Sequence, residues 1–244
     1  MHTDSAIRKY LCRQKVATFA PKAVLFDMDG VLLHSMQNHA FAWVEAMKSY
    51  GISMTEHDAY MTEGQRGIDT IRQMVLLQQG KEIEVAEAQR MYDEKARIFH
   101  SLPEAPIMPG IIPLMQLIKA EGLAISIVTG SGQRLLIDRL TTDFSPYVTE
   151  EKIVTAYDVT RGKPDPEPYL AGMKKCGVLP TETIVVENAP LGVRAGEASG
   201  AFTIAVNTGP LPDSVLLDEG ADLLFHDINA LYQAFPDIIH QSKQ

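Results

Sequence analysis

The segment AVLFDMDGVLLHS places two carboxylates, Asp27 and Asp29, directly after an apolar run. Residues 23–26 predict a short buried β-strand, and Gly30 releases the backbone just beyond its carboxyl end, where open α/β sheets bind ligands. A spacing of two in extended backbone aims both carboxylates the same way. Because an unperturbed aspartate has a pKa of about 3.9, Asp27 can attack phosphorus without a base, and Asp29 can handle the proton. An acidic turn or a calcium loop is the alternative, but the spacing does not fit an EF-hand.

Two later segments supply groups that can hold a phosphate. ISIVTGSG predicts a strand that ends in Thr129, Gly130 and Ser131, just before the expected start of a helix. A hydroxyl and free backbone N–H groups at that point form an anion cradle, although an ordinary capped turn would carry the same residues. RGKPDPEPYL adds Lys163, held by Pro164 ahead of another helix. By itself, such a lysine is more often only solvated.

A fourth segment, TIVVENAPLGV, predicts a strand that ends in Glu187 and Asn188. Carboxylate and amide oxygens are ligands that Mg²⁺ accepts. The alternative is a capped helix start, with Pro190 in the first turn.

In this order, the four segments resemble the haloacid dehalogenase superfamily, in its β-phosphoglucomutase-like phosphatase branch. The resemblance covers nearly the whole chain after about residue 20. It implies that Asp27 is the nucleophile, which becomes an aspartyl phosphate, and that Asp29 is the general acid and base. It further implies that Thr129 and Lys163 hold the transferring phosphoryl group.

The same resemblance implies Mg²⁺ as the cofactor. Its ligands would be Asp27, the backbone carbonyl of Asp29 and Asn188, with Glu187 binding directly or through water. In-line phosphoryl transfer needs positioning and charge neutralisation, which a metal ion and a lysine provide. Because Mg²⁺ and Lys163 both lower the pKa of Asp29, we expect cap closure and desolvation to raise it for acid catalysis.

Composition limits the classes of partner. The 244 residues are 45% hydrophobic and carry a net charge of -9, which argues against nucleic acid or an anionic membrane as partner. No apolar run approaches the roughly 18 residues of a membrane span, and Cys12 and Cys176 fit a reducing cytosol. We therefore expect a cytoplasmic protein with a small phosphorylated substrate. The oligomeric state stays open.

The chain predicts an α/β fold: a doubly wound, mostly parallel Rossmann-like core with an inserted helical cap domain. Residues 1–22 form an N-terminal extension, residues 23–34 and 103–244 the core, and residues 35–102 the cap. Within the cap we expect helices over 35–50, from residue 55, over 67–80 and over 84–99. In the first of these, Ser35 is the expected cap, and Phe41, Val44 and Met47 are spaced for one apolar face.

Three cap residues are candidates for contact with substrate or metal. His39 and Lys95 match cap positions near the substrate in the resembled branch, although each could be an ordinary surface residue. Glu63 is a departure: related sugar-phosphate mutases carry a basic residue there and an arginine where this chain has Gly67. An acid that faces a phosphate dianion is unfavourable unless metal lies between them, so Glu63 either points to solvent or meets Mg²⁺.

Two further departures lie in the core segments. Asn188 stands where many relatives have aspartate, which removes a negative charge that Glu63 could restore. His34 stands where relatives usually carry aspartate, and we attach no chemistry to it.

These departures favour a Mg²⁺-dependent phosphohydrolase acting on inorganic pyrophosphate or another small phosphorylated metabolite, as in the inorganic pyrophosphatases of the same branch. A β-phosphoglucomutase that interconverts β-glucose 1-phosphate and glucose 6-phosphate is the alternative, because both enzymes share the core residues. A phosphate-binding module without catalysis is the remote alternative, and the intact pair Asp27 and Asp29 argues against it.

Overall fold

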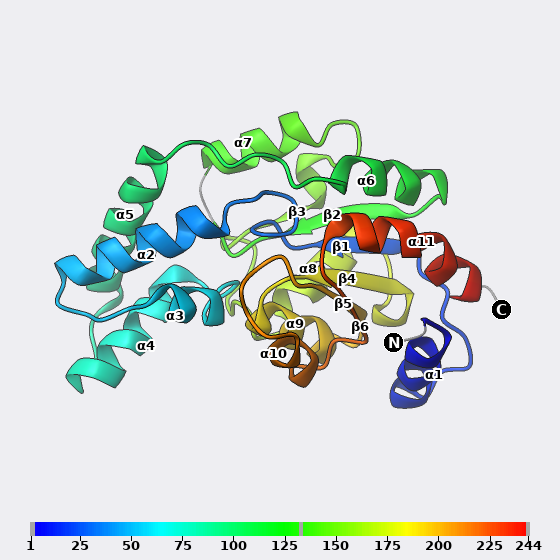
Figure 1. The fold of residues 1–244 in the computed structure, drawn as a ribbon, viewed down its shortest axis with the longest axis horizontal. Coiled ribbons are helices and arrows are strands. Elements are labelled where there is room, and N and C mark those ends of the chain that lie inside the picture. Colours follow the sequence, from blue (N-terminus) through cyan, green and yellow to red (C-terminus); the bar gives the residue numbers. More distant parts are fainter. Residues whose placement is uncertain (1–2, 132–133, 243–244) are drawn as a thin grey trace.

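The protein, described here as a computed structural model over residues 3–131 and 134–242, is built on one parallel sheet. Its six strands lie in the order β3-β2-β1-β4-β5-β6 (Figure 1). They are β1 (Ala23–Phe26), β2 (Ala124–Val128), β3 (Ile153–Val154), β4 (Thr183–Glu187), β5 (Phe202–Val206) and β6 (Leu223–Phe225). The α/β fold predicted from the sequence is thereby confirmed. Because β1 lies between β2 and β4, the carboxyl ends of these three strands are neighbours.

Helices cover both faces of the sheet. Alternate residues of β1 point to opposite faces, so Val24 and Phe26 pack in one apolar cluster, and Ala23 and Leu25 in another. The core helices are α1 (Thr3–Gln14), α6 (Ile111–Ala120), α7 (Arg134–Asp143), α8 (Glu167–Cys176), α9 (Pro190–Ala198), α10 (Asp213–Asp218) and α11 (Ile228–Ser242), with short 3-10 turns η1 (Glu150–Lys152) and η2 (Pro180–Glu182). In Figure 1, α6, α7 and α11 lie above the sheet and α8 to α10 below it.

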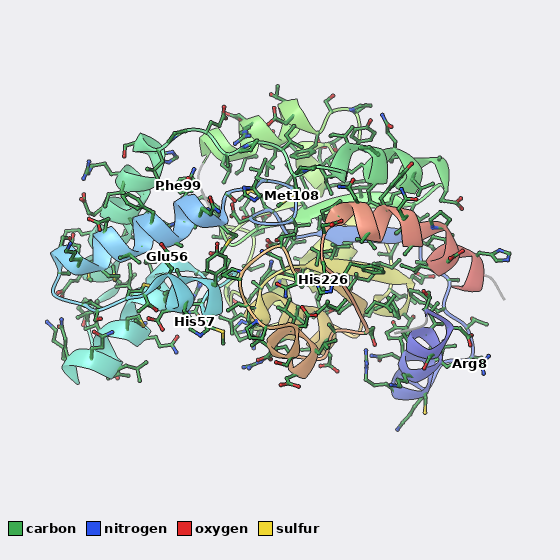
Figure 2. The ribbon with its side chains drawn as sticks, in the orientation of Figure 1. Arg8, Glu56, His57, Phe99, Met108 and His226 are labelled. Carbon is green, nitrogen blue, oxygen red and sulfur yellow. The ribbon has the colours of Figure 1, made fainter. Side chains whose placement is uncertain are left out.

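Four helices occupy the stretch predicted as a cap, and we keep that name for them. They are α2 (Met36–Ser49), α3 (Glu56–Met61), α4 (Gly67–Gln79) and α5 (Val85–Ser101). They form one end of the molecule, at the left of Figure 1, around their own apolar cluster. Figure 2 shows Phe99 on α5 and, where the chain has returned to the core, Met108.

Two details of α2 differ from the prediction. Ser35 precedes the helix but makes no side-chain capping bond, because its hydroxyl donates to Asp29 instead. Of the predicted apolar face, Met47 is buried and Val44 is half-buried, but Phe41 is 49% exposed, and Trp43 is buried instead. The cap therefore buries a different stripe of α2 from the one that the spacing of aromatic and aliphatic residues indicated.

The N-terminal extension is packed onto the core. Tyr10 is fully buried, its hydroxyl donates to the Gly200 carbonyl at 2.9 Å, and its ring meets Phe19 and Phe202 edge-on. Arg13 donates two hydrogen bonds to Asp222, at 2.9 and 3.0 Å. Since Asp222 is buried, this ion pair ties α1 to the loop before β6.

No helix in the described part of the chain is long and apolar enough to cross a bilayer. Cys12 and Cys176 are both free thiols.

Candidate active site

The ends of three adjacent strands bring the predicted core residues together. Asp27 follows β1 and is held by a backbone hydrogen bond to the Val186 carbonyl of β4 at 3.0 Å. Thr129 follows β2, and its N–H donates to the Val154 carbonyl of β3 at 2.9 Å. Both side chains are buried. The sheet register thus fixes the positions of these groups before any side-chain contact is made.

Lys163 reaches into this site from the loop before α8. Its ammonium group donates to Asp27 Oδ1 at 2.5 Å, to Glu187 Oε1 at 2.7 Å and to the Val128 carbonyl at 3.2 Å. Burial by itself would lower the pKa of Lys163, but the two carboxylates outweigh it and raise the pKa. The lysine is therefore a fixed positive charge at the predicted nucleophile.

Both carboxylate oxygens of Glu187 accept hydrogen bonds. Oε1 accepts from Lys163 and from the Tyr169 hydroxyl at 2.7 Å each, while Oε2 accepts from the backbone N–H groups of Asn188 at 2.9 Å and Ala189 at 3.1 Å. A Cβ on Gly192 would lie 1.8 Å from Oε1, so a glycine is required there. This arrangement suits a residue that positions Lys163 more than one that binds a metal directly.

Asn188 shows the feature expected of a metal ligand. Its Oδ1 is buried and has no hydrogen-bond partner in the described structure. A Cβ on Gly30 would lie 2.0 Å from the amide nitrogen of Asn188, so Gly30 leaves room for this side chain. A buried oxygen without a donor is costly unless a cation or water meets it.

The charges at the site also fit a divalent cation. Among the described side chains, four carboxylates, those of Asp27, Asp29, Glu63 and Glu187, face two lysines, Lys95 and Lys163. Burial and the nearby Glu187 raise the pKa of Asp27 well above its ordinary range. Within the described ranges, no three His, Cys, Asp or Glu side chains form a metal cluster on their own. The predicted Mg²⁺ ligands are not such a cluster, because they include an amide oxygen, that of Asn188, and the backbone carbonyl of Asp29.

Asp29 lies at the boundary between core and cap. Its Oδ1 accepts from the Ser35 hydroxyl at 2.5 Å and lies 3.0 Å from His39 Nε2. Burial raises the pKa of Asp29, but the hydrogen bonds from His39 and Ser35 and the charge of Lys95 together lower it below the ordinary value. The expectation that cap closure raises this pKa is wrong, because closure also brings in donors. Asp29 is therefore ionised at neutral pH.

His39 links Asp29 to Lys95. Lys95 Nζ lies 2.7 Å from His39 Nδ1, and an ammonium group can only donate, so Nδ1 accepts and Nε2 carries the proton toward Asp29. The Lys95 side chain is buried, with Nζ 5.1 Å from the ring centroids of both Trp43 and Phe99. Burial lowers the pKa of Lys95 to about 8. Neither residue is an ordinary surface group.

Glu63 lines the same cavity as Asp29, His39 and Lys95. Burial and the charge of Asp29 raise the pKa of Glu63, whereas the charge of Lys95 lowers it. The half-buried Glu63 thus lines the cavity that holds Asp29, His39 and Lys95, and it is not a fully solvated cap residue.

The cap is closed onto the core at the segment predicted to bind phosphate, Thr129 to Ser131. Thr129 Oγ1 accepts from the Ser131 N–H at 3.0 Å. A Cβ on Gly130 would lie 3.0 Å from the Gly64 carbonyl of the cap loop, so the two backbones are almost in contact. Arg66 adds a bond from Nη1 to the Thr160 carbonyl at 2.6 Å. Residues 132–133, where the predicted helix start falls, lie outside the described residues.

Reasoning from the sequence missed two partners, Ser35 for Asp29 and Tyr169 for Glu187. The sequence predicts Ser35 as a helix cap, and nothing in PEPYL marks the tyrosine. His34, to which no chemistry was attached, is exposed and uses its backbone N–H to bond the Pro106 carbonyl at 2.9 Å, where the two core–cap connections meet.

Comparison with known sequences gives a consistent family. Residues 21–200 match the haloacid dehalogenase-like hydrolase family. Hexitol phosphatase A of Escherichia coli is 31% identical over 210 residues, which are 86% of this chain and 93% of the relative. β-Phosphoglucomutase of Bacillus subtilis is 28% identical over 197 residues, covering 77% of this chain and 84% of the relative.

Comparison with solved structures agrees. A protein of Bacteroides vulgatus, named "Putative beta-phosphoglucomutase", is 45% identical with a TM-score of 0.95 and covers 99% of this chain and 98% of its own. The family match, the relatives and the strand-end carboxylates all point the same way: the chain is an enzyme that belongs to the haloacid dehalogenase-like hydrolase family.

Proposed function

We propose that the protein is a Mg²⁺-dependent phosphohydrolase that works through an aspartyl phosphate on Asp27 and prefers inorganic pyrophosphate or a similarly small phosphate ester. The observation that carries the proposal is the position of Glu63 in the catalytic cavity beside Asp29, His39 and Lys95. A carboxylate there repels a phosphate ester, but it is favourable beside a divalent cation that the substrate shares.

The size of the cavity supports a small substrate. Its volume is about 40 Å³. Since a water molecule needs about 10 to 15 Å³ of cavity volume, the closed site has room for about three waters. The pocket walls include Trp43, Tyr92 and Phe99, which leave little space beside the reacting groups for a sugar ring.

The residues support a two-step reaction. A carboxylate oxygen of Asp27 attacks phosphorus, and the bond from phosphorus to the leaving oxygen breaks. Lys163 stabilises the charge on the transferring group. Asp29 gives a proton to the leaving oxygen and then takes one from the water that attacks the aspartyl phosphate, which releases inorganic phosphate and frees Asp27. Because Asp29 is ionised at rest, the first proton arrives with the substrate or passes through His39.

Asp27, Asn188 and the backbone carbonyl of Asp29 would hold Mg²⁺, and the unpartnered Oδ1 of Asn188 is the observation that supports this set. When bound, the ion supplies positive charge that lets an anionic nucleophile approach an anionic substrate. Glu63 would add a ligand to the Mg²⁺ from the cap. Glu187 would act indirectly, by orienting Lys163.

A second candidate, phosphoryl transfer on a sugar phosphate, has support from the relatives. The names of the compared proteins include a hexitol phosphatase and β-phosphoglucomutases, so a sugar phosphate remains the alternative substrate. The hydrolase is favoured because Gly67 stands where the resembled mutases have an arginine, and no other described arginine lines the cavity.

The test is an assay on pyrophosphate, hexose phosphates and an aryl phosphate, with Mg²⁺ or with EDTA. Turnover should require Mg²⁺, and pyrophosphate should give the highest kcat/KM. Glu63→Gln should lower kcat/KM for pyrophosphate by more than the 10- to 100-fold typical of an outer-shell partner, and lower it less for the aryl phosphate. Glu56→Gln, a change at an exposed cap acid (Figure 2), is the matched control and should leave both unchanged. Efficient conversion of β-glucose 1-phosphate to glucose 6-phosphate, with pyrophosphate ignored, would establish the mutase instead.

A further inference from the structure

Two cavities lie side by side between the cap and the core. The catalytic cavity is about 40 Å³, and a second one of about 560 Å³ opens outside it. Both are lined by Gly67, Tyr92 and Gly130, so these residues form the wall between them. The outer volume lies within the range of about 300 to 1,000 Å³ that is usual for small-molecule sites. The small reacting space therefore adjoins a space large enough for a sugar.

The ring of Tyr92 lies where a side chain of residue 67 would otherwise be. A Cβ built on Gly67 would fall 2.2 Å from both Cδ2 and Cε2 of the ring. Gly67 begins α4, and its φ is not positive, so the glycine serves to make room and not to permit an unusual backbone. Tyr92 is thus seated directly on the backbone of the helix opposite its own.

Other cap residues hold the ring from the side of the catalytic cavity. The Trp43 ring centroid is 6.3 Å from that of Tyr92, and Lys95 Nζ is 5.9 Å from the Tyr92 centroid. Beyond the ring, the outer cavity presents polar side chains, among them Gln89, Asp93 and His100. Such groups can hydrogen-bond the hydroxyls of a polyol, but the ring separates them from the reacting carboxylates.

We propose that Tyr92, seated on Gly67, sets the upper size limit of the leaving group. With the ring in place, the catalytic cavity accepts a phosphate or a short ester. Without it, the two cavities join, and the polar walls of the outer one receive the hydroxyls of a hexose or hexitol phosphate. The proposal rests on the proposed function, since it concerns the substrate class of that same site.

The test is a size series of phosphomonoesters, from glycolate and glycerol phosphates to hexitol phosphates, measured as kcat/KM. Tyr92→Ala should raise the ratio for the largest ester over the smallest by about tenfold or more, the scale on which pocket fit discriminates substrates. Most of the change should appear in KM. Tyr92→Phe keeps the ring and is the matched control, so its ratio should equal that of the wild type.

A second variant reaches the same ring from the other side. Gly67→Ala keeps Tyr92 but forces the ring to move, because the added Cβ has no space. It should shift the ratio in the same direction as Tyr92→Ala, even if the latter also weakens activity by disturbing Lys95. Thermal unfolding of each variant confirms that it is folded.

A ratio that stays at the wild-type value in both Tyr92→Ala and Gly67→Ala would overturn the proposal and leave Tyr92 as packing for Lys95. This outcome is independent of the proposed function. If wild type ignores pyrophosphate, that function fails, whereas the ratio within the ester series still decides the role of Tyr92.

Discussion

The two halves of the site are built in different ways. In the core half, Asp27, Lys163 and Glu187 form a buried network whose members are fixed by strand ends and backbone bonds. In the cap half, His39 and Lys95 come from two helices and reach Asp29 only through side-chain contacts across the interface. The contacts of the core half are made within the core, whereas those of the cap half require the cap to lie against the core. On the proposed function, we expect the core half to carry out the chemistry and the cap half to select the substrate.

The largest effect should come from the core half. Asp27→Asn keeps the shape of the side chain but removes the attacking charge, so kcat should fall by several orders of magnitude for every substrate. Brief mixing with radiolabelled substrate and acid quenching should leave label on the wild type but not on the variant. A variant that retains a tenth of the wild-type kcat would show that Asp27 is not the nucleophile.

A smaller effect is expected at the boundary. Asp29→Asn should lower kcat by about 10² to 10⁴-fold, the usual contribution of a general acid or base. The loss should be greatest for esters with poor leaving groups, which need the proton most. We would measure kcat across aryl and alkyl phosphates of graded leaving-group pKa. Equal losses along the series would exclude the acid role.

The smallest effect concerns the cap half and depends on pH. Burial lowers the pKa of Lys95 to about 8 from its ordinary value of 10.5. Above pH 8 the lysine loses its charge, so activity should fall as its support for His39 and Glu63 weakens. Stability should move the other way. Between pH 8 and 10.5 the unfolded chain binds more protons at this residue than the folded one, so unfolding free energy should rise, by up to about 3 kcal/mol.

Lys95→Met separates these two trends from the titration of other groups. The variant should be less active at pH 7. Between pH 8 and 10.5 the free energy of unfolding of the wild type should rise, and that of the variant should lack this rise. The free energy of unfolding from urea titrations, read as the difference between the two proteins at each pH, is the measurement. A constant difference would mean that Lys95 is not a buried charge in the folded enzyme.

The core half was predictable from the sequence because each of its residues is marked by the residues directly before it in the chain. Asp27, Thr129 and Glu187 each stand at the end of an apolar run, and parallel strands bring such ends together. The strand at 23–26 is observed within the same bounds. Asp29 was identified as well, but the direction of its pKa was not, because the donors Ser35 and His39 are set by how α2 leaves the core.

The cap half was less predictable because helix surfaces give ambiguous signals. Phe41 had the right spacing for the apolar face of α2 and is exposed, since small residues such as Ala40 and Ala46 allow α2 to lie close to its neighbours. Lys95 stands in a charged stretch and reads as a solvated residue, although its helix turns it inward. The contact of Gly67 with Tyr92 joins two helices and leaves no trace in either sequence segment.

The docking of α1 has a consequence for synthesis on the ribosome. Tyr10 bonds a carbonyl 190 residues further along the chain, and Arg13 pairs with a carboxylate 209 residues away. At about 5 to 20 residues per second, the partner of Arg13 emerges roughly 10 to 40 seconds after the arginine. Through that interval the helix has no surface to cover, and its apolar side chains stay accessible to chaperones. Helix α1 is thus made long before its partners and can settle against them only after they emerge.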